Sequence, residues 1–448
     1  MNIQNKLFIL IFLQACFLVG CAPKVAKCEK PKEGFQPLVL SLPLVNINII
    51  DRNGLSETIN SKERLKFYET TDFLTSQPYQ KVLRVFGKDK DGAIRSIITS
   101  YHANGQVKQY LEVMNGRAQG QYVEWHPNGK KKLLGSIIAG IADVDVKAQL
   151  SWSFDGSCFA WNEEGIVLTQ IPYVKGDLHG TARYFHANAA LAKEVPYIKG
   201  AIDGEMKCYS PDSTLLESTH FSQGTLEGTS AGFWNADCPA WTEYFNDGFL
   251  QTGSYFDTKG ILLSSVADGC GRRCIFDATG PHEFYEYIDG KPEGQVLVLE
   301  NNKFLICSYF LKDGEKHGKE TLYYSKRPFL KNTDSPPVPK LSVDWYEGKI
   351  HGMVKSWYDS SVQESQREMS QNVKQGTLTA WYKNGNLMLI EEYEKDKLVR
   401  GEYLKKGESR PISRVEKGKG IATLFDCDGN FNRKVPYQDG RPVDDLAQ

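Results

Sequence analysis

Residues 173–185 read YVKGDLHGTARYF and contain the spacing that decides the fold. Gly176 lies three positions after Tyr173, Gly180 lies four positions after Gly176, and Phe185 lies five positions after Gly180. Nine segments that we identify as repeats begin with a glycine followed five positions later by a large apolar residue, and eight of these nine partners are aromatic. Recurrence at a fixed spacing indicates an array of small structural units and argues against a single enzyme core.

The nine pairs lie between residues 120 and 425. They are Gly120 and Trp125, Gly180 and Phe185, Gly204 and Tyr209, Gly228 and Phe233, Gly294 and Leu299, Gly318 and Tyr323, Gly352 and Trp357, Gly376 and Trp381, and Gly420 and Phe425. In seven of them another glycine lies four residues upstream, at positions 116, 176, 200, 224, 290, 314 and 348. The spacing of 24 residues between Gly176, Gly200 and Gly224 gives each unit room for two short strands and two turns.

Within each unit, the residues two and four positions after the glycine are more often apolar or small than their neighbours. This period of two predicts a half-buried strand. The large residue five positions after the glycine falls on the other parity, so either both faces of the strand pack or a β-bulge redirects this side chain. Asn104-Gly105, Asn128-Gly129 and Asn384-Gly385 predict two-residue type I′ turns. We therefore expect an all-β fold, an elongated array of antiparallel β-hairpins.

Several segments depart from the repeat. Residues 46–98 predict a small α+β cap, with a helix over 61–68 that has Ser61 as its N-cap, and with strands over 81–86 and 93–100 on either side of a turn at Asp91-Gly92. The repeats are expected over 99–228 and 290–440, with irregular, cysteine-containing repeats over 229–289. Within the second region, the proline-rich residues 326–341 predict a surface loop, residues 401–419 a poorly packed excursion, and residues 441–448 a frayed tail.

The first 21 residues read as a targeting signal. Lys6 precedes an apolar run from Leu7 to Val19, which is too short for a typical membrane-spanning helix. Residues 18–21, LVGC, resemble the lipobox of bacterial lipoproteins. That resemblance implies cleavage after Gly20, diacylglyceride and palmitate attachment at Cys21, and a membrane-anchored protein. Because Ala22 follows the cysteine, the outer membrane is the expected destination, and residues 21–45 are the expected tether.

Of the ten cysteines, eight lie beyond the lipobox, in what would be an oxidising compartment. Only Cys270 and Cys274 are close in sequence. A local disulfide between them is the favoured interpretation, and free buried thiols are the next. No second cysteine pair or histidine cluster supplies the ligands of a structural zinc site, so no metal is expected.

The recurring pattern of an aromatic residue, Asn-Gly, a second aromatic residue and two glycines resembles MORN repeats, specifically the bacterial variant described as antitoxin-like. Tyr101-His-Ala-Asn104-Gly105 and Tyr173-Val-Lys-Gly176-Asp-Leu-His179-Gly180 carry the resemblance, which covers roughly residues 99–440. It implies a meander of β-hairpins used as a scaffold, an oligomerisation surface or a membrane-apposed module. It implies no enzymatic activity.

The remaining features favour a non-catalytic protein. The net charge of −1 removes the electrostatic argument for a nucleic-acid partner. No nucleophile, metalloprotease or phosphate-binding motif is present, so neither enzymatic activity nor a cofactor is expected. His179, His317 and His351 share one repeat position and read as polar corner residues, with a stacked metal or pH-sensing ridge as the alternative. We expect a lipid-anchored envelope protein that presents a binding or scaffold surface to a protein or envelope component. A purely structural, self-assembling protein and a glycan-acting enzyme remain as alternatives.

Overall fold

The computed structural model describes residues 35–37, 44–88, 90–324 and 337–443. It consists almost entirely of antiparallel strands, with 64% strand and 3% helix, so the predicted all-β fold is confirmed. Sequential strands pair as a meander, as expected for a hairpin array. The chain divides into two compact units, Met1–Pro239 and Ala240–Gln448, which are described separately below.

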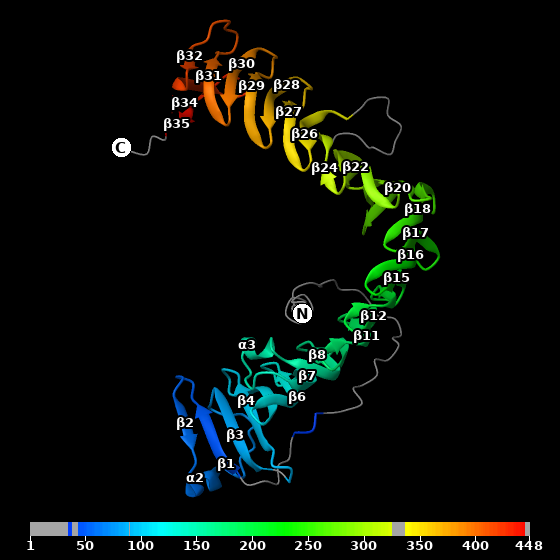
Figure 1. The fold of residues 1–448 in the computed structure, drawn as a ribbon, viewed down its shortest axis with the longest axis vertical. Helices are drawn as coiled ribbons and strands as arrows, with labels where there is room; N and C mark the ends of the chain where they lie inside the picture. Colours follow the sequence, from blue (N-terminus) through cyan, green and yellow to red (C-terminus); the bar gives the residue numbers. More distant parts are fainter. Residues whose placement is uncertain (1–34, 38–43, 89, 325–336, 444–448) are drawn as a thin grey trace. The chain divides into compact units, whose positions relative to one another are not determined.

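The first unit begins with the cap and continues into the repeats (Figure 1). Its elements are β1 (Leu44–Ile50), β2 (Ser56–Ile59), α2 (Lys62–Tyr68), β3 (Lys81–Lys88), β4 (Ile94–Tyr101), β5 (Val107–Met114), β6 (Arg117–Trp125), β7 (Lys131–Ala139), α3 (Val146–Gln149), β8 (Ser153–Trp161), β9 (Val167–Val174), β10 (Asp177–Leu178), β11 (Gly180–Phe185), β12 (Leu191–Ile198), β13 (Ala201–Ile202), β14 (Gly204–Tyr209), β15 (Leu215–Ser222) and β16 (Thr225–Asn235). β1 pairs with both β2 and β3, so the strand order starts β2, β1, β3 and then follows the sequence.

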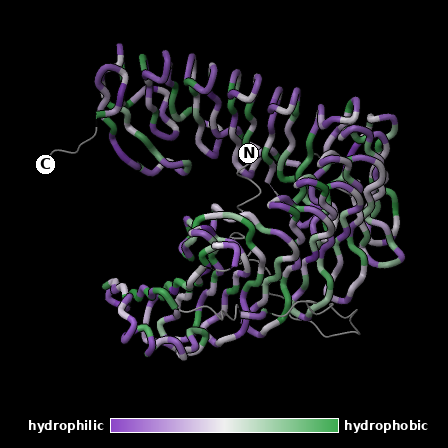
Figure 2. The backbone as a smooth tube through the Cα atoms, turned by 60° about the horizontal axis from the view of Figure 1, so that its bottom comes forward, coloured by the Kyte–Doolittle hydropathy of each residue, from purple (hydrophilic) through white to green (hydrophobic). Residues whose placement is uncertain are grey.

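The second unit is a continuous meander. Its strands are β17 (Cys238–Asn246), β18 (Phe249–Phe256), β19 (Leu262–Ala267), β20 (Cys270–Asp277), β21 (Gly280–Ile288), β22 (Lys291–Glu300), β23 (Phe304–Lys312), β24 (Glu315–Lys316), β25 (Gly318–Tyr323), β26 (Pro339–Tyr346), β27 (Lys349–Trp357), β28 (Gln363–Ser370), β29 (Val373–Trp381), β30 (Leu387–Glu394), β31 (Lys397–Tyr403), β32 (Ser413–Glu416), β33 (Lys419–Phe425), β34 (Phe431–Gln438) and β35 (Arg441–Pro442). Hydrophilic residues gather at the hairpin tips of this unit (Figure 2).

The two-residue turns lie at the upstream glycines of the repeat. Lys175 and Gly176 have φ values of 49° and 94°, and Asp313 and Gly314 have values of 51° and 80°. Positive φ at both central residues defines the type I′ turn, whose twist matches that of paired strands. Glycine takes the second position at little conformational cost, which explains why the sequence spacing marks this turn so clearly.

The prediction that Asn-Gly forms type I′ turns is wrong. At Asn104-Gly105 only the glycine has positive φ, and His102 N–H donates to the Gln106 carbonyl at 2.8 Å. This is a longer hairpin loop with a glycine in the left-handed position, followed by a bulge. The reason lies in the next hairpin, because the Asn104 side chain donates to the Pro127 carbonyl at 2.9 Å and also accepts from Gln106 N–H.

The large residue five positions after each glycine lies at a β-bulge, on a strand that packs on both faces. The strand register shifts at this residue in hairpin after hairpin, for example between Glu124 and Trp125. Both faces of the strand also pack, since Tyr122 lies in one core cluster while Val123 and Trp125 lie in another. The β-bulge and the packing on both faces therefore occur together. The bulge arises at the hairpin loop, whereas both faces are buried because hairpins stack on one another.

The cap matches its prediction. Helix α2 covers Lys62–Tyr68, and Ser61 lies at the N-cap without donating or accepting a capping hydrogen bond through its side chain. Strands β3 and β4 flank the turn at Asp91-Gly92. Ile47, Val82 and Tyr101 share one buried cluster, so the cap packs directly on the first repeat.

The expected tether is not wholly separate from the array. Within it, the Phe35 ring packs edge-on against Tyr110 at 5.1 Å and against Trp125 at 5.6 Å between ring centroids. Residues 44 and 45, which we had assigned to the tether, belong to strand β1. The proposed signal peptide and lipobox, residues 1–21, lie outside the described residues.

Four segments differ in part from their predictions. Residues 229–289 form regular paired strands, although the spacing of their glycines differs from that of the other repeats. Residues 401–419 are poorly packed only in part, because Tyr403 and Val415 are fully buried in a core cluster whereas residues 405–410 are exposed. The predicted loop 326–341 ends earlier, because Pro339 already begins β26, and residues 325–336 lie outside the described part. In the expected tail, Arg441 and Pro442 form β35, whereas residues 444–448 are not described.

Candidate functional site

The glycine that opens each repeat strand packs against a side chain eight residues upstream. Gly120 has φ of 122°, and a Cβ at this position would lie 2.6 Å from the Cβ of Glu112. The Glu112 carboxylate then accepts a hydrogen bond of 3.0 Å from Gln121 N–H, a backbone donor at the irregularity in the ladder. The same arrangement recurs in the second unit, where Glu286 accepts from Gln295 N–H and Asp344 from Met353 N–H.

The other predicted repeat glycines also hold special backbone positions. Positive φ is found at all of them. At each of these glycines the left-handed conformation would strain any other residue. The glycines for which a structural role is predicted are Gly120, Gly176, Gly180, Gly200, Gly204, Gly318 and Gly352. At Gly180 and Gly204 the upstream neighbour is a proline, Pro172 or Pro196, packed within 3.3 Å of the missing Cβ.

Successive hairpins are joined by the side chain that directly follows the aromatic residue at the end of a strand, a feature that was not predicted from the sequence. In the first unit it is a histidine whose Nε2 lies within hydrogen-bond distance of a carbonyl in a neighbouring hairpin. The pairs are His102 with Trp125 O at 2.9 Å, His126 with Trp161 O at 3.0 Å, and His186 with Tyr209 O at 2.9 Å. These contacts, which we call inter-hairpin staples, satisfy carbonyls that the bulge removes from the ladder.

In the second unit the same staple position is occupied by tyrosine. The hydroxyl groups of three tyrosines donate to carbonyls of the following hairpins at 2.7–2.8 Å: Tyr324 to Trp357 O, Tyr358 to Trp381 O, and Tyr382 to Leu404 O. An aromatic or histidine residue directly after the large apolar residue was therefore a usable sequence signal. Its meaning depends on the distance between hairpins, which the sequence does not reveal.

Replacing Tyr382 by phenylalanine tests the staple. Tyr382 is fully buried, so Tyr382→Phe leaves the Leu404 carbonyl without its donor, and we expect the free energy of unfolding to fall by about 1–2 kcal/mol. Tyr346→Phe is the matched control, because Tyr346 is exposed and its replacement is expected to stay within about 0.5 kcal/mol. Urea denaturation of the two variants measures the difference, and equal midpoints would contradict the role of the staple.

The large residues five positions after the glycines do not form an exposed strip. Leu299 is fully buried and Trp125 nearly so. The other seven large residues are half-buried: Phe185, Tyr209, Phe233, Tyr323, Trp357, Trp381 and Phe425. Their rings therefore contribute mainly to packing between hairpins, and a recognition surface has to be sought elsewhere.

The three corner histidines lie at the surface or close to it. His179 accepts a long hydrogen bond of 3.5 Å from Lys199 N–H. The Tyr346 ring lies between the other two, at 5.2 Å from His317 and 6.1 Å from His351. Within the described part of the chain, no group of three histidine, cysteine or acidic side chains is arranged to hold a metal ion.

The predicted disulfide between Cys270 and Cys274 is wrong. Both thiols are free and lie on the single strand β20, four residues apart. Four residues of strand span about 13 Å, whereas a disulfide requires Cα atoms within about 7 Å. Burial raises the pKa of the Cys274 thiol, while Cys270 is exposed.

Thiol labelling distinguishes the two cysteines. In the native protein at neutral pH, iodoacetamide is expected to modify Cys270 at least tenfold faster than Cys274, because the buried thiol rarely forms a thiolate and has little access to solvent. Peptide mass spectrometry after a short pulse measures both rates. Comparable labelling before denaturation, or a peptide containing the intact disulfide, would contradict the assignment.

Among the described residues of the second unit, the carboxylates of Glu243 and Glu391 are buried, and both are fully engaged. Glu243 is 6% exposed and receives hydrogen bonds from Tyr255 Oη at 2.7 Å and from Arg273 Nε and Nη2 at 2.7 and 3.0 Å. Glu391 receives hydrogen bonds from Tyr393 Oη at 2.9 Å and Tyr403 Oη at 2.7 Å. Burial, together with the neighbouring carboxylate, raises the pKa of each of these tyrosines. Both sites are closed networks that hold strands together.

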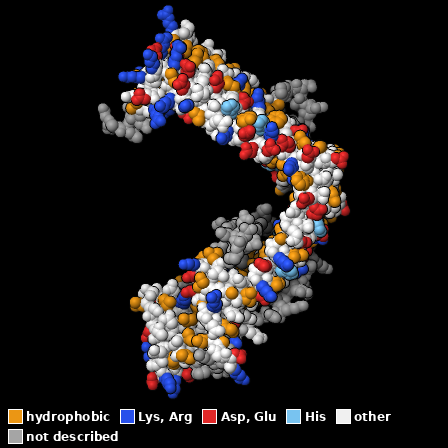
Figure 3. Space-filling model, viewed as in Figure 1, with side chains coloured by type: hydrophobic (Ala, Val, Ile, Leu, Met, Phe, Trp, Pro, Cys, Tyr) orange, Lys and Arg blue, Asp and Glu red, His pale blue; other side chains and the backbone are white. Residues whose placement is uncertain are grey.

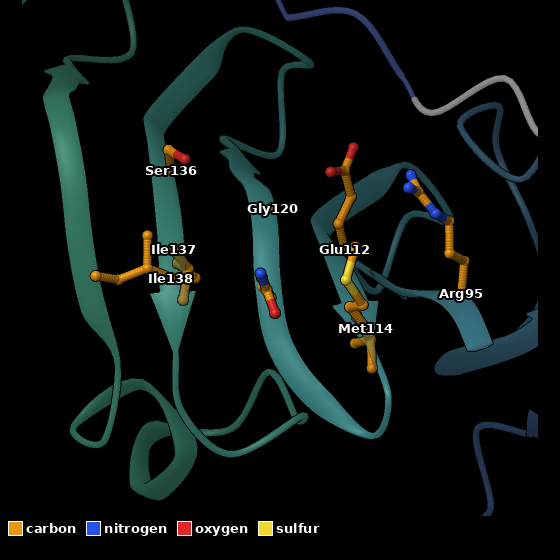
Figure 4. A pocket seen from close by; sticks show the side chains of 9 residues that line it. Arg95, Glu112, Met114, Gly120, Ser136, Ile137 and Ile138 are labelled. Carbon is orange, nitrogen blue, oxygen red and sulfur yellow. The ribbon is translucent and has the colours of Figure 1, made fainter. Parts of the chain in front are cut away.

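A hollow of about 270 Å³ lies on the face of β4–β7 in the first unit. Figure 4 shows Arg95, Glu112 and Met114 on one side of it and Ile138 on the other. Glu112 already accepts the hydrogen bond from Gln121 N–H, so the hollow offers one basic group and apolar surface but no pair of free carboxylates.

Exposed apolar side chains recur at the residue before the type I′ turn. In the first unit these are Val174 and Ile198, on successive hairpins. In the second unit the same position is taken by Ile288 and Tyr346. Apolar side chains at the surface lie among charged ones in both units (Figure 3).

No protein-family model matches the sequence, and no curated protein is similar to it. Among solved structures, the chain is similar to the crystal structure of TcdB2-TccC3-TEV, with 10% identity and a TM-score of 0.14 over 87% of this chain and 24% of that chain. It is also similar to the crystal structure of TcdB2-TccC3 without its hypervariable C-terminal region, with 9% identity and a TM-score of 0.15 over 90% of this chain and 24% of that chain. The chain thus spans about a quarter of the length of these structures. Among the described residues no helix has the length and apolarity needed to cross a membrane.

Proposed function

We propose that this chain is a lipid-anchored cell-envelope protein whose repeats, of the bacterial MORN variant, provide a non-catalytic binding and scaffold surface for a protein or envelope partner. The observation that carries the proposal is the recurrence of exposed apolar side chains before the type I′ turns, as at Val174 and Ile198. Repetition at one turn position places such side chains along the hairpin edge of each unit, where a partner has access to them.

Rigidity of the array supports a role in binding. The staples and the carboxylates beside the repeat glycines fix each hairpin against its neighbour. A surface that is ordered before it meets its partner loses less conformational entropy on association. The apolar edge residues can therefore contribute to affinity without a folding step.

The engagement of the buried acids supports a non-catalytic role. A glycan-acting enzyme uses two carboxylates, one of which gives or takes a proton while the other acts as nucleophile or base. Glu243 is instead bound by a bidentate arginine, and Glu391 is bound by two tyrosines. The arrangement favours structure over chemistry at both positions.

The experiment has two arms. Expression in a bacterium with radiolabelled palmitate tests the anchor, and Cys21→Ser is expected to abolish labelling and to release the protein from the membrane fraction. Crosslinking in intact cells followed by affinity capture then tests the surface, with Cys21→Ser as the mislocalised control and Val174→Asp with Ile198→Asp as the surface variant. A crosslinked partner that is lost in both variants supports the proposal.

Two outcomes would contradict it. Unchanged partners in the Cys21→Ser strain would show that binding does not depend on the envelope location. Crosslinks that contain only a second copy of this chain would favour the alternative of a self-assembling structural protein.

A further inference from the structure

One hairpin of the first unit carries an insertion. The hairpins β5–β6 and β9–β10 turn with two residues, at 115–116 and 175–176. At the corresponding position between them, β7 and β8 are joined by residues 140–152, GIADVDVKAQLSW, which contain the single-turn helix α3. The insertion presents Ile141, Val146 and Leu150 to solvent, with exposed fractions of 52%, 59% and 44%. Ile138, in the adjoining strand, is exposed as well.

The base of the insertion is firmly held. Asp143 forms an ion pair of 2.6 Å with Lys81, and Trp152 Nε1 donates to the Ile141 carbonyl at 2.9 Å. The Trp152 ring also packs on Tyr122 at 4.7 Å between centroids. The exposed apolar side chains are therefore a fixed feature of the surface and not a consequence of local disorder.

Basic side chains border the apolar ones. The exposed Arg117 forms an isolated β-bridge with Ile141, and the exposed Lys147 lies within α3 between Val146 and Leu150. Of the acidic residues of the insertion, Asp143 pairs with Lys81 of β3, and Asp145 caps α3 by accepting from Ala148 N–H at 2.7 Å. Apolar side chains with a basic border suit an interface between water and an anionic lipid surface.

The tether brings this edge within reach of a membrane. Phe35 packs on Trp125, at the end of β6, and Arg117 lies at the start of the same strand. Eight residues of strand span about 26 Å. The fourteen residues from Cys21 to Phe35 extend to at most about 50 Å, so a lipid on Cys21 can enter a bilayer that this edge of the array also touches.

From these observations we infer that the apolar insertion 138–150 docks on the lipid surface, with Ile141, Val146 and Leu150 entering the headgroup boundary. This inference rests on the proposed envelope location and adds the bilayer as a direct partner of the folded array. The lipid on Cys21 and the insertion then form two separate contacts, which would fix the orientation of the first unit on the membrane.

The test uses the mature chain from position 21 with Cys21→Ser, so that no acyl chain contributes. Co-flotation is measured with vesicles of phosphatidylglycerol and phosphatidylethanolamine and with vesicles of phosphatidylcholine. We expect the chain to float with the anionic vesicles, and the double variant Ile141→Asp and Val146→Asp to lower its partition about tenfold. Leu55→Asp with Phe67→Asp is the matched control, which changes exposed apolar residues of the cap, outside both the insertion and the proposed binding surface, and is expected to stay within about twofold.

The inference is overturned if the parent chain does not float, if the insertion variant floats as well as the parent, or if both variants lose partition equally. Equal flotation with neutral vesicles would overturn the role assigned to Arg117 and Lys147. Circular dichroism checks that the variants remain folded, which is expected because the substituted side chains are exposed. Failure of palmitate labelling at Cys21 would contradict the proposed function without altering this measurement, so the two ideas fail separately.

Discussion

Replacement of Gly269 by alanine is expected to destabilise the second unit by about 2–5 kcal/mol. Asp268 and Gly269 form a type I′ turn, and φ at Gly269 is 73°. Alanine in this conformation is strained by roughly 1–2 kcal/mol. Its Cβ would also lie 2.7 Å from Gly290 N, a backbone atom that cannot move away without breaking the turn, which adds about 1–3 kcal/mol.

The reason for this crowding is a junction of three hairpin tips. Gly269 N–H donates to the Gln251 carbonyl at 2.8 Å, Gly290 N–H to the Gly269 carbonyl at 2.9 Å, and Leu250 N–H to the Gly290 carbonyl at 3.2 Å. The chain builds the same junction a second time, where Gly418 N–H donates to Val399 O, Gly440 N–H to Gly418 O, and Leu398 N–H to Gly440 O.

Gly314→Ala is the matched control for Gly269→Ala. Gly314 occupies the same position of a type I′ turn in the same unit, with φ of 80°, but no atom lies within 4 Å of the position of its Cβ. Only the backbone strain of roughly 1–2 kcal/mol is therefore expected. Hydrogen exchange of peptides from 241–290, measured with urea unfolding of the full chain, reports the local and global effects, and equal losses in both variants would contradict the junction.

The second large effect is expected for Glu243→Ala, which should lower the free energy of unfolding by about 3–5 kcal/mol. The carboxylate is buried, and its removal leaves Arg273 charged and without its bidentate partner. The guanidinium keeps the 3.2 Å hydrogen bond from Nη1 to Tyr287 Oη and its position over the Phe245 and Tyr287 rings. Breaking one side of a buried ion pair is costly because the other charge stays desolvated. The Tyr255 hydroxyl loses its acceptor as well.

Two variants separate this explanation from a general effect of losing a carboxylate. Glu402→Ala removes an acid that pairs with the exposed Arg400 in the same unit, and we expect less than about 1 kcal/mol. Glu243→Leu combined with Arg273→Leu removes both buried charges and should recover part of the loss caused by Glu243→Ala. Urea midpoints of the three variants provide the measurement, and a double variant as unstable as Glu243→Ala would argue against desolvation as the cause.

These expectations also bear on the proposed surface. If the staples, junctions and buried networks fix the hairpins, changes at exposed edge residues such as Val174 and Ile141 should alter binding while leaving unfolding nearly unchanged. Variants of Gly269, Glu243 and Tyr382 should instead act on stability first. The two groups of variants thus separate the scaffold from the surface that it presents.

The hairpin array could be predicted from the sequence because its signals are local. A type I′ turn needs positive φ, glycine supplies it most easily, and strands between such turns show a period of two. The cap helix, its two strands and the special glycines at Gly120 and Gly204 followed from the same local rules. The lipobox at Cys21 is equally local, and it remains a prediction for the labelling experiment.

How neighbouring hairpins meet could not be predicted from the sequence. The Tyr382 staple, the buried Glu243 network and the junction at Gly269 each depend on distances between residues of different strands. Cys270 and Cys274 illustrate the same point, because their short separation in sequence becomes about 13 Å once both lie on one extended strand. Local rules fix the shape of each hairpin, whereas the offset between neighbouring hairpins follows from packing across the whole array, and that offset determines which side chains become staples, which become core and which stay exposed.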